Sequence, residues 1–496
     1  MRPALISLDI GSSGARASVF LSDGRLLAAS RCAYPTSYPK QGWAEQDANR
    51  WAEASIKVLS AVAVRAKALS LDLRGLALTG TCPTYVPVDS SINTLGPALT
   101  YQDNRSGAEA DELADRFGVD EIRAFAGNSP RAFYILPEIL WHKRHDPALY
   151  DRLAKALQPS DFVIHRLTGE LVTSTTHASG TLAFDIRRRR WNDEFVASAG
   201  LKAGLFPARV ADPWDVVGTL LKSVARETGL PADLPVVMGA PDSQCCALGV
   251  GAVKQGALSN MSGTSTCLDC SVDAVVDDPA VGNWCDVTPG RWSVEVGLNT
   301  TGGALDWFAR VALPDKGRDR YLAIDKLVRS SRAGAGGVLF MPYLTGGERD
   351  SQRVKGGFHN LGIEHGKADM LRAVLEGVAF AERQRIELLT AAGCHIDDMR
   401  ISGGGAKLDV WNQIKADVTG LPVMAVTKVD AAELGAAMLA GIGVGIFADA
   451  AAAVESCQTP AKLFTPRPAR VLEYQDRYQA FRSCENALAA PGFGTE

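Results

Sequence analysis

Residues Leu5–Phe20, LISLDIGSSGARASVF, place a glycine-serine turn between two β-prone runs, with an aspartate just before the turn. A dinucleotide-binding turn needs three spaced glycines that open a helix. Here Gly11 and Gly14 are followed by Ala-Arg-Ala-Ser-Val-Phe, whose valine and phenylalanine favour a strand. The segment is therefore predicted to form a strand-turn-strand hairpin and not a Rossmann turn.

A similar pattern returns about half a chain later. Ala257–Val272, ALSNMSGTSTCLDCSV, has a β-prone run, a tight turn at Gly263–Ser265 and a second β-prone run. Self-similarity within a chain indicates repeated structural units, although short glycine-serine turns also arise by chance. The two hairpins suggest two similar domains.

The rest of the chain alternates helical and strand patterns. Asn49–Ser70 has apolar residues at helical spacing, Leu73–Thr79 is a short apolar run typical of a buried strand, and Asp146–Leu157 opens with an Asp-Pro helix start. A chain of 496 residues is too long for a single hydrophobic core. We therefore predict an α/β protein with two large domains.

The charge balance argues against nucleic-acid and membrane partners. Lys and Arg number 52 against 56 Asp and Glu, a net charge of −4, which gives no basic field. The apolar start of the chain is interrupted at Asp9, unlike an export signal, and the apolar stretch Leu434–Phe447 is short for a bilayer. Ten cysteines without a disulfide-like spacing suit a reducing compartment. We expect a cytoplasmic protein that binds a small neutral or anionic metabolite.

Three conspicuous motifs are interpreted without a functional role. Cys267-Leu-Asp-Cys270 has zinc-like spacing but no second pair, so two buried strand thiols are predicted. The four arginines at 187–190 are isolated in an acidic chain and indicate a solvated hairpin tip. His142 and His145 lie one helical turn apart without a nearby carboxylate ligand, which favours an exposed helix face.

The two hairpins have the composition of phosphate-binding turns. Small residues between strands expose backbone N–H groups and hydroxyls in a concave arc that suits phosphate oxygens. Asp9, at the mouth of the first arc, would suit Mg²⁺, because magnesium prefers few carboxylates together with phosphate oxygens. The same aspartate would equally suit an Asx-type turn that caps the backbone at Gly11 or Ser12. The residues alone leave both interpretations open.

A second aspartate follows another predicted strand. In Pro235–Val253, PVVMGAPDSQCCALGVGAV, a strand and a turn lead to Asp242, which opens a helix rich in small residues. Such an aspartate is often only a helix N-cap. The alternative is a general base at the domain junction, which a hydroxyl nucleophile attacking a γ-phosphoryl group requires.

The third candidate is a glycine run. Ile401–Val423 reads as a strand, three glycines and a helix, and glycines at a helix entrance let a ring or ribose approach the backbone. Ala432–Gly445 is predicted to form a small-residue helix beside it. Close helix packing is the alternative explanation of these glycines.

Together these segments resemble a known family, the FGGY carbohydrate kinases, within the actin, hexokinase and heat-shock chaperone superfamily. The resemblance covers nearly the whole chain, in the family's order, and rests on DIGSSGAR, GWAEQDANRW, TYQDNRS, PSDFVIHRLTGELVTSTTHASGTLAFD, GAPDSQCCALGVG, SGTS, FMPYLTGGER, LRAVLEGVAF and SGGGAKLDVWNQIKADVTG. It implies two actin-like, ribonuclease H-like α/β domains around a central cleft, at residues 1–243 and 244–496, with the last helix a candidate for packing back on the first domain.

The resemblance also implies the reaction and the residues that perform it. ATP with Mg²⁺ would donate its γ-phosphate to a hydroxyl of a sugar or polyol. Asp242 matches the catalytic base and Asp9 the metal-associated aspartate. The remaining matches are phosphate contacts at Ser12, Ser13, Gly263 and Thr264, a weaker nucleotide-side match at Gly302 and Gly303, and an adenosine motif at Gly404 and Gly405.

The departures from the family concern the sugar. The segment with Thr81 and Cys82 matches the family's substrate segment, yet it has neither the Arg-Glu of glycerol kinases nor the Met-His of typical xylulokinases, and it is closer to ribulokinase-like forms. A second substrate-lining match contains Tyr101, Gln102, Asp103 and Arg105. An aromatic ring and side chains with two polar atoms suit the binding of a polyhydroxylated chain. The resemblance also implies that Asp242 contacts the substrate.

The expected substrate is a ketopentose, D-xylulose or D-ribulose, and glycerol is expected to be poor. A pentitol is the main alternative substrate. A non-metabolic actin-like ATPase and a sugar-binding pseudokinase are the alternative functions. Kinases of this resemblance are often homodimers.

Two further positions differ from the family. Glu138 stands where a lysine is expected and Asn360 where a glycine is expected. Both changes are predicted to affect local surface or loop geometry and to leave the phosphoryl-transfer residues unaffected.

Overall fold

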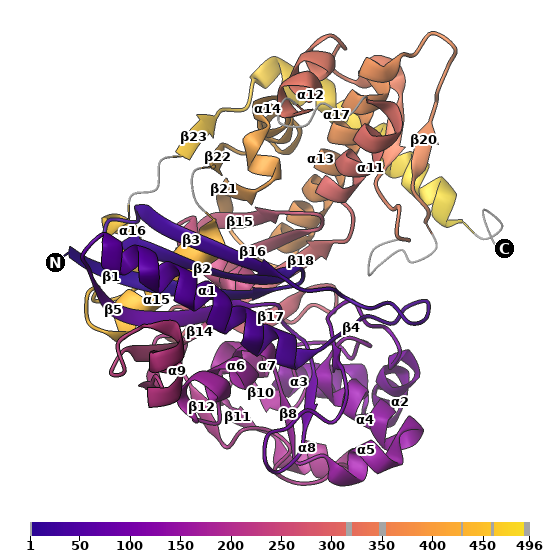
Figure 1. Ribbon diagram of the computed structural model, residues 1–496. Coiled ribbons are helices and arrows are strands. Elements are labelled where there is room, and N and C mark those ends of the chain that lie inside the picture. Colours follow the sequence, from indigo (N-terminus) through magenta and orange to yellow (C-terminus); the bar gives the residue numbers. More distant parts are fainter. Residues whose placement is uncertain (1, 314–319, 347–353, 428–429, 458–460, 491–496) are drawn as a thin grey trace. The chain divides into compact units, whose positions relative to one another are not determined.

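The computed structural model describes residues 2–313, 320–346, 354–427, 430–457 and 461–490 (Figure 1). The chain forms two compact units. Unit 1 contains Met1–Val253, Val272–Val294 and Ala431–Gln458, and unit 2 contains Lys254–Ser271, Glu295–Asp430 and Thr459–Glu496.

Unit 1 is built on a six-stranded sheet with the order β13-β14-β5-β1-β2-β3. The strands β1 to β3 form an antiparallel meander, whereas β5 and β14 run parallel to β1. The bounds are β1 (Arg2–Gly11), β2 (Gly14–Leu21), β3 (Leu26–Ala33), β5 (Leu71–Gly80), β13 (Val216–Thr219) and β14 (Pro235–Pro241). The predicted hairpin at Leu5–Phe20 and the strand at Leu73–Thr79 are therefore confirmed.

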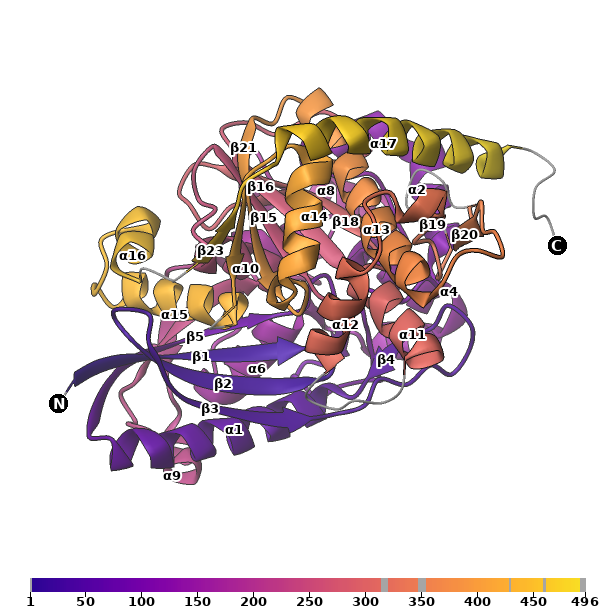
Figure 2. The ribbon, with the colours of Figure 1, turned by 90° about the horizontal axis from the view of Figure 1, so that it is seen from above.

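Helices cover both faces of this sheet, and the periodicity of β1 shows how (Figure 2). Ala4, Ile6, Leu8 and Ile10 join the core that contains residues of α1 (Ala48–Ala68). The neighbouring Leu5 instead faces α15 (Ala431–Gly443), where it approaches Gly441. Because both faces are covered, the strand reads as an almost continuous apolar run.

The other elements of unit 1 surround this sheet or form a smaller helical region. They are β4 (Glu45–Gln46), β6 (Val86–Val88), β7 (Ala98–Leu99), α2 (Gly107–Phe117), α3 (Val119–Ala126), α4 (Ile135–His145), α5 (Pro147–Arg152), β8 (Lys155–Leu157), α6 (Pro159–Thr168), β9 (Val172–Ser174), α7 (Thr175–Ser179), β10 (Phe184–Asp185), β11 (Arg190–Trp191), α8 (Asp193–Ser198), β12 (Arg209–Ala211), α9 (Lys222–Thr228), α10 (Asp242–Gly249), β17 (Gly282–Cys285) and α16 (Ala450–Ser456).

Unit 2 contains the second predicted hairpin. Its strands run in the order β18-β16-β15-β21-β22-β23, and β21 is parallel to β15. The bounds are β15 (Gly256–Ser262), β16 (Thr266–Val272), β18 (Trp292–Leu298), α11 (Gly302–Ala312), α12 (Arg320–Arg329), β19 (Leu339–Met341), β20 (Gly357–His359), α13 (Lys367–Ala391), β21 (Ile396–Gly403), α14 (Asp409–Thr419), β22 (Val423–Val426), β23 (Ala461–Phe464) and α17 (Pro468–Ala489), with short 3₁₀ turns at Ala335–Gly337 and Gly405–Lys407.

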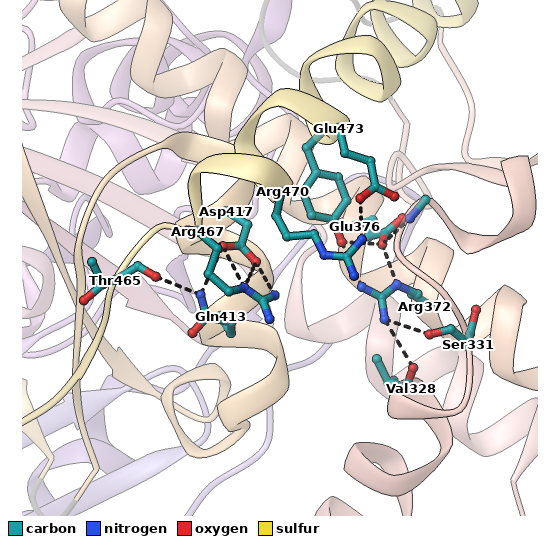
Figure 3. A network of polar contacts seen from close by, with 12 residues as sticks. Val328, Ser331, Arg372, Glu376, Gln413, Asp417, Thr465, Arg467, Arg470 and Glu473 are labelled. Atoms are coloured by element: carbon teal, nitrogen blue, oxygen red, sulfur yellow. Dashed lines mark hydrogen bonds and ion pairs between the residues drawn. The ribbon is translucent and has the colours of Figure 1, made fainter.

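The last helix, α17, packs within unit 2 (Figure 3). At its start, Arg467 Nε donates to Asp417 Oδ2 on α14 at 3.1 Å. Further along, the Tyr474 hydroxyl donates to Glu376 on α13 at 2.6 Å and accepts from Arg372 at 2.9 Å. The C-terminal segment that instead joins unit 1 is Ala431–Gln458, so the compact units do not follow a single cut at 243/244.

Local expectations can be checked element by element. Asp146 caps α5 through a 3.0 Å bond from Leu149 N, but the helix ends at Arg152 and β8 follows, so the predicted helical segment is shorter than expected. The arginine run forms the tip between β10 and β11, as predicted. Among the described residues, no helix is both long and apolar enough to cross a bilayer.

Candidate active site

The first turn, Ser12-Ser13, is held from behind by hydrogen bonds to its carbonyl oxygens. Tyr34 Oη donates to Gly11 O at 2.7 Å, and Gln46 Nε2 donates to Ser12 O at 2.7 Å. Arg31 Nη2 donates to Ser13 Oγ at 2.7 Å. Both serines are exposed. With its acceptor groups occupied, the turn is suited to present N–H groups to an anion.

Asp9 lies on the face of the sheet that α15 covers. It is paired in register with Arg16 on β2, and Arg16 Nη1 contacts Glu433 Oε1 of α15 at 2.9 Å. Glu433 also accepts from Ser18. Asp9 is partly exposed, and its carboxylate approaches Gly11, which fits the hard oxygen donor that magnesium prefers. The described residues contain no cluster of three or more His, Cys, Asp or Glu suited to a metal.

Asp242 stands at the carboxyl edge of the same sheet. Strand β14 ends at Pro241, which pairs with Gly80 of β5, and α10 begins at Asp242. The N-cap position of α10 is Pro241, and Asp242 Oδ1 accepts from the adjacent Ser243 N at 2.9 Å. The carboxylate is partly exposed. Asp242 is therefore the first residue of α10 and not its N-cap residue.

Buried neighbours connect Asp242 with the first hairpin. Burial raises the pKa of the Cys245 thiol to about 12, with smaller contributions from the negative charges of Asp242 and Asp9. Burial likewise raises the pKa of Tyr101 to about 12, with a contribution from Asp242, while hydrogen bonding to the Ser12 side chain acts in the opposite direction. The structure thus brings Asp9, Ser12, Tyr101 and Asp242 into one electrostatic neighbourhood.

The Thr81–Cys82 segment continues β5 at this edge. Thr81 N donates to Ile10 O at 3.1 Å, so Thr81 is buried beside the end of β1. The half-buried Cys82 donates from Sγ to Gln158 Oε1 at 2.9 Å, and Gln158 Nε2 donates to His177 O at 2.6 Å. A neutral amide side chain, Gln158, therefore holds Cys82 from behind.

The second substrate-lining segment divides into exposed and buried residues. Gln102 is exposed and accepts at Oε1 from Tyr38 Oη at 3.1 Å, whereas the side chains of Asp103 and Arg105 are only 1% and 3% exposed. Arg105 donates to both Asp103 oxygens and to Glu45 Oε1 at 2.7 Å. Its guanidinium lies 3.6 Å from the Trp43 ring centre. This geometry shows that Asp103 and Arg105 hold the segment in place, and their contact with the sugar stays a prediction.

A buried acid lies next to this pair. Glu138 on α4 is 0% exposed, and neither of its carboxylate oxygens has a hydrogen-bond partner among the described residues. Burial, and then the charge of Asp103, raise the pKa of Glu138 well above its ordinary value. One turn on, His142 is 4% exposed, and burial lowers its pKa to about 4. The expected surface role of Glu138 and the expected exposed face at His142 are therefore wrong.

Asn360 has a simpler explanation. Its φ is +56°, in the left-handed region that glycine adopts freely and that asparagine tolerates better than most residues. Its Nδ2 donates to Gly337 O at 3.0 Å. The asparagine can therefore take the place of the family's glycine without a change of backbone.

In unit 2, the start of α11 packs on the second turn. Thr264 O accepts from Thr301 N at 3.0 Å and from Gly303 N at 2.9 Å. A Cβ at Gly302 would lie closer than 3.0 Å to Gly263 O, which real side chains do not allow. The turn at 263–264 and the helix start at 302–303, which were predicted separately, are thus in direct contact. Gly263 and Thr264 are exposed at this contact.

The glycine run lies on the other side of the same hairpin. Gly403 has φ +84° and packs on Ser262 O, and a Cβ at Gly405 would lie closer than 3.0 Å to Ser262 Oγ. Gly404 is exposed and lies near Tyr321 Oη. Close packing therefore accounts for Gly403 and Gly405. The small-residue helix α15, expected beside this run, instead packs on α10, where Gly435 meets Cys245 O.

Comparison with known proteins decides the family. The profile of the N-terminal domain of the FGGY family of carbohydrate kinases matches residues 4–249, and that of its C-terminal domain matches residues 258–444. The chain belongs to the FGGY family of carbohydrate kinases.

Individual relatives agree with this family. The chain is 29% identical to a xylulose kinase of Bacillus subtilis (strain 168) over 97% of this chain and 96% of the relative. It is 31% identical to a xylulose kinase of Klebsiella pneumoniae over 90% of this chain and 91% of that one. The crystal structure of xylulose kinase from Rhodospirillum rubrum superposes with a TM-score of 0.90 at 28% identity, covering 98% of this chain and 99% of that chain. This FGGY kinase is thus an ATP-dependent sugar kinase with a two-domain α/β fold.

Several residues of this neighbourhood were missed by sequence reasoning. Arg16 and Glu433 are 417 positions apart and meet only in the fold. Trp43 and Trp141 form an edge-to-face pair, with ring centres 5.4 Å apart, against Arg105. The GWAEQD motif contains Trp43, but its sequence carries no signal for the partner tryptophan.

Proposed function

We propose that this FGGY kinase transfers the γ-phosphate of ATP to a terminal hydroxyl of a five-carbon ketose, with D-xylulose as the first choice. The observation that carries the proposal is the partly exposed carboxylate of Asp242, at the carboxyl edge of the unit 1 sheet, in the same neighbourhood as Ser12 and Tyr101. A general base and a phosphate-binding turn are the two groups that this chemistry requires together.

In this proposal Asp242 accepts the proton of the substrate hydroxyl. As the proton moves to the carboxylate, the hydroxyl oxygen forms a bond to the γ-phosphorus, the bond from that phosphorus to the β–γ bridging oxygen breaks, and ADP leaves. Tyr101, whose pKa is raised, stays protonated at neutral pH, so it can donate a hydrogen bond but does not compete as a base.

Each unit has a turn that we propose as a contact for nucleotide phosphates. Ser12 and Ser13 from unit 1, and Gly263 and Thr264 from unit 2, present small residues in exposed turns that suit phosphate oxygens. Mg²⁺, when bound, neutralises charge on the β- and γ-phosphates, and Asp9 is the residue we propose to hold it. We propose that adenosine contacts the backbone at the exposed Gly404.

The choice of sugar is supported by two observations. The relatives named above act on xylulose by their names, over nearly the full length of this chain. The half-buried Cys82, held by the buried Gln158, provides a neutral thiol, and neither the Arg-Glu of glycerol kinases nor the Met-His of typical xylulokinases is present. D-ribulose is the second ketopentose, and a pentitol remains the alternative because the same neutral groups could bind it. Dimer formation stays a prediction of the resemblance.

Sugar-dependent release of ADP tests the proposal. A coupled assay with Mg-ATP would compare D-xylulose, D-ribulose, pentitols and no sugar, and we expect the highest kcat/KM with a ketopentose. A pentitol preferred over both ketopentoses would redirect the assignment to a polyol kinase. ADP release that no sugar increases would instead favour a non-metabolic actin-like ATPase.

A further inference from the structure

A fully buried ion pair lies beneath the proposed nucleotide turns of unit 2. Lys415 Nζ on α14 lies 2.7 Å from Glu382 Oε1 on α13, and both side chains are 0% exposed. The Lys415 ammonium also lies 4.7 Å from the centre of the Trp411 ring. Glu382 Oε2 has no hydrogen-bond partner among the described residues. Buried ion pairs are often no more stable than apolar pairs of similar size, so stability alone is a weak explanation for this one.

Both members of the pair contact β15 just before its turn. Lys415 Nζ donates to Ser262 Oγ at 3.4 Å, and Asn260 Nδ2 donates to Glu382 Oε1 at 3.3 Å. Ser262 is the last residue of β15, and Gly263 opens the turn that follows. The ion pair therefore fixes the strand end from which Gly263 and Thr264 project.

Ser262 is also the residue on which the glycine run packs. Ser262 and Gly403 are partners in the parallel register of β15 and β21. Cβ atoms at Gly403 and Gly405 would each lie closer than 3.0 Å to Ser262, the first to its carbonyl and the second to its Oγ. One serine thus contacts the ion pair, the phosphate turn and the adenosine run.

We propose that the Lys415–Glu382 pair is a positioning element for the nucleotide, acting through Ser262 on the turn at Gly263–Thr264 and on the run at Gly403–Gly405. The proposal rests on the nucleotide roles given to these turns above. A charged pair with directed hydrogen bonds fixes the place of Ser262 more narrowly than apolar side chains of similar volume do.

Unit 2 offers a matched control for this proposal. Arg372 and Glu376 on α13 form a second buried pair, with Nε–Oε1 at 2.6 Å and side chains that are 9% and 3% exposed (Figure 3). Its contacts are Tyr474 of α17 and the carbonyls of Val328 and Ser331. This control pair is therefore also buried in unit 2, but it is connected to the last helix.

The test compares the double variants Lys415→Met/Glu382→Leu and Arg372→Met/Glu376→Leu. We would measure Tm, the Kd for ADP by calorimetry, and KM for ATP and for sugar. Removal of both charges together avoids an unpaired buried ion. We expect the first double variant to bind ADP at least about tenfold more weakly with KM for sugar unchanged, because small misplacements of binding groups have large effects. The control pair should change Tm without changing the Kd for ADP.

A well-folded Lys415→Met/Glu382→Leu protein that binds ADP like the wild type would overturn the proposal. If that variant does not fold, Ser262→Ala keeps the ion pair and removes its contact with the turns. Weaker ADP binding by Ser262→Ala then supports the proposal, and unchanged binding rejects it. A wild-type protein that binds no ADP would reject the proposed function itself, and this inference with it.

Discussion

At the scale of single residues, Asp242 carries the clearest prediction. Its carboxylate is partly exposed and does not occupy the N-cap position of α10. We expect Asp242→Asn to keep the fold and most of the sugar affinity but to lower kcat by at least about a hundredfold, the usual contribution of a general base. Steady-state kinetics with a binding titration of the sugar would check this. Near-normal turnover of the Asn variant would return Asp242 to a structural role.

Glu138 gives a prediction for the pH dependence of stability. Its pKa is raised in the folded protein by burial and by the charge of Asp103, from an ordinary value of 4.5. The facing groups are Asp103 and Arg105 from the substrate-lining segment, with Tyr85 and the neutral His142 beside them. The protonated carboxyl is favoured in the folded state, so its stabilising contribution is complete below pH 4.5 and is lost as the pH rises towards the folded pKa.

The Glu138→Gln variant has no proton to lose and should avoid this loss. Between pH 4.5 and the folded pKa, its free energy of unfolding relative to wild type should rise by up to about 1.4 kcal/mol per pH unit. Urea unfolding at pH 5 and pH 8 measures the difference, and the exposed Glu455→Gln serves as a control. A difference that does not change with pH would mean that Glu138 is ionised in the folded protein.

At the scale of elements, the β1–β2 hairpin is predicted to act on the metal and phosphate side. Asp9 lies at the mouth of its turn, and Thr81 N bonds to the adjacent Ile10 O. We expect Asp9→Ala to raise the Mg²⁺ concentration needed for half-maximal activity while sugar affinity changes little, because its proposed contact is with the metal. Magnesium titrations of both proteins measure this. An unchanged magnesium dependence would reject the assignment of Asp9.

The packing of α11 on the second turn gives a steric prediction. A Cβ at Gly302 would approach Gly263 O closer than 3.0 Å, whereas a Cβ at Gly107, at the start of α2, would have no atom within 4 Å. Gly302→Ala must therefore displace the phosphate turn. We expect it to weaken ADP binding by about tenfold or more, while Gly107→Ala leaves binding unchanged. Equal ADP affinity of the two variants would show that the turn tolerates the displacement.

At the scale of the whole molecule, the prediction concerns discrimination between substrates. A site built for one pattern of hydroxyl groups rejects a molecule that leaves its polar groups unpaired. The charge of Asp242 acts on Tyr101, and Thr81 and Cys82 follow Gly80, which pairs with Pro241 in the sheet. The Arg-Glu of glycerol kinases is absent. We expect kcat/KM for glycerol to be at least about a hundredfold below that for the best ketopentose. Preference for glycerol would overturn the argument from these residues and leave the kinase assignment intact.

The sequence by itself determined the parts of this protein that depend on local pattern. Glycine-serine turns between β-prone runs identify both hairpins. Asp9 and Asp242 were selected as candidate site residues because each lies near the end of a strand. These features are readable because a turn and the strands that flank it are set by neighbouring residues. The ordered series of motifs then indicated the family, which the domain profiles confirm.

Only the tertiary structure decided which polar residues are buried and what they contact. Sequence reasoning placed His142 on an exposed helix face and interpreted Glu138 as a change of local surface or loop geometry, yet the fold buries both side chains. It also joins Arg16 to Glu433 of a distant helix and places Lys415 beside Glu382 and Ser262. The burial of a charged side chain depends on segments from distant parts of the chain that pack around it. Local periodicity does not predict which segments these are.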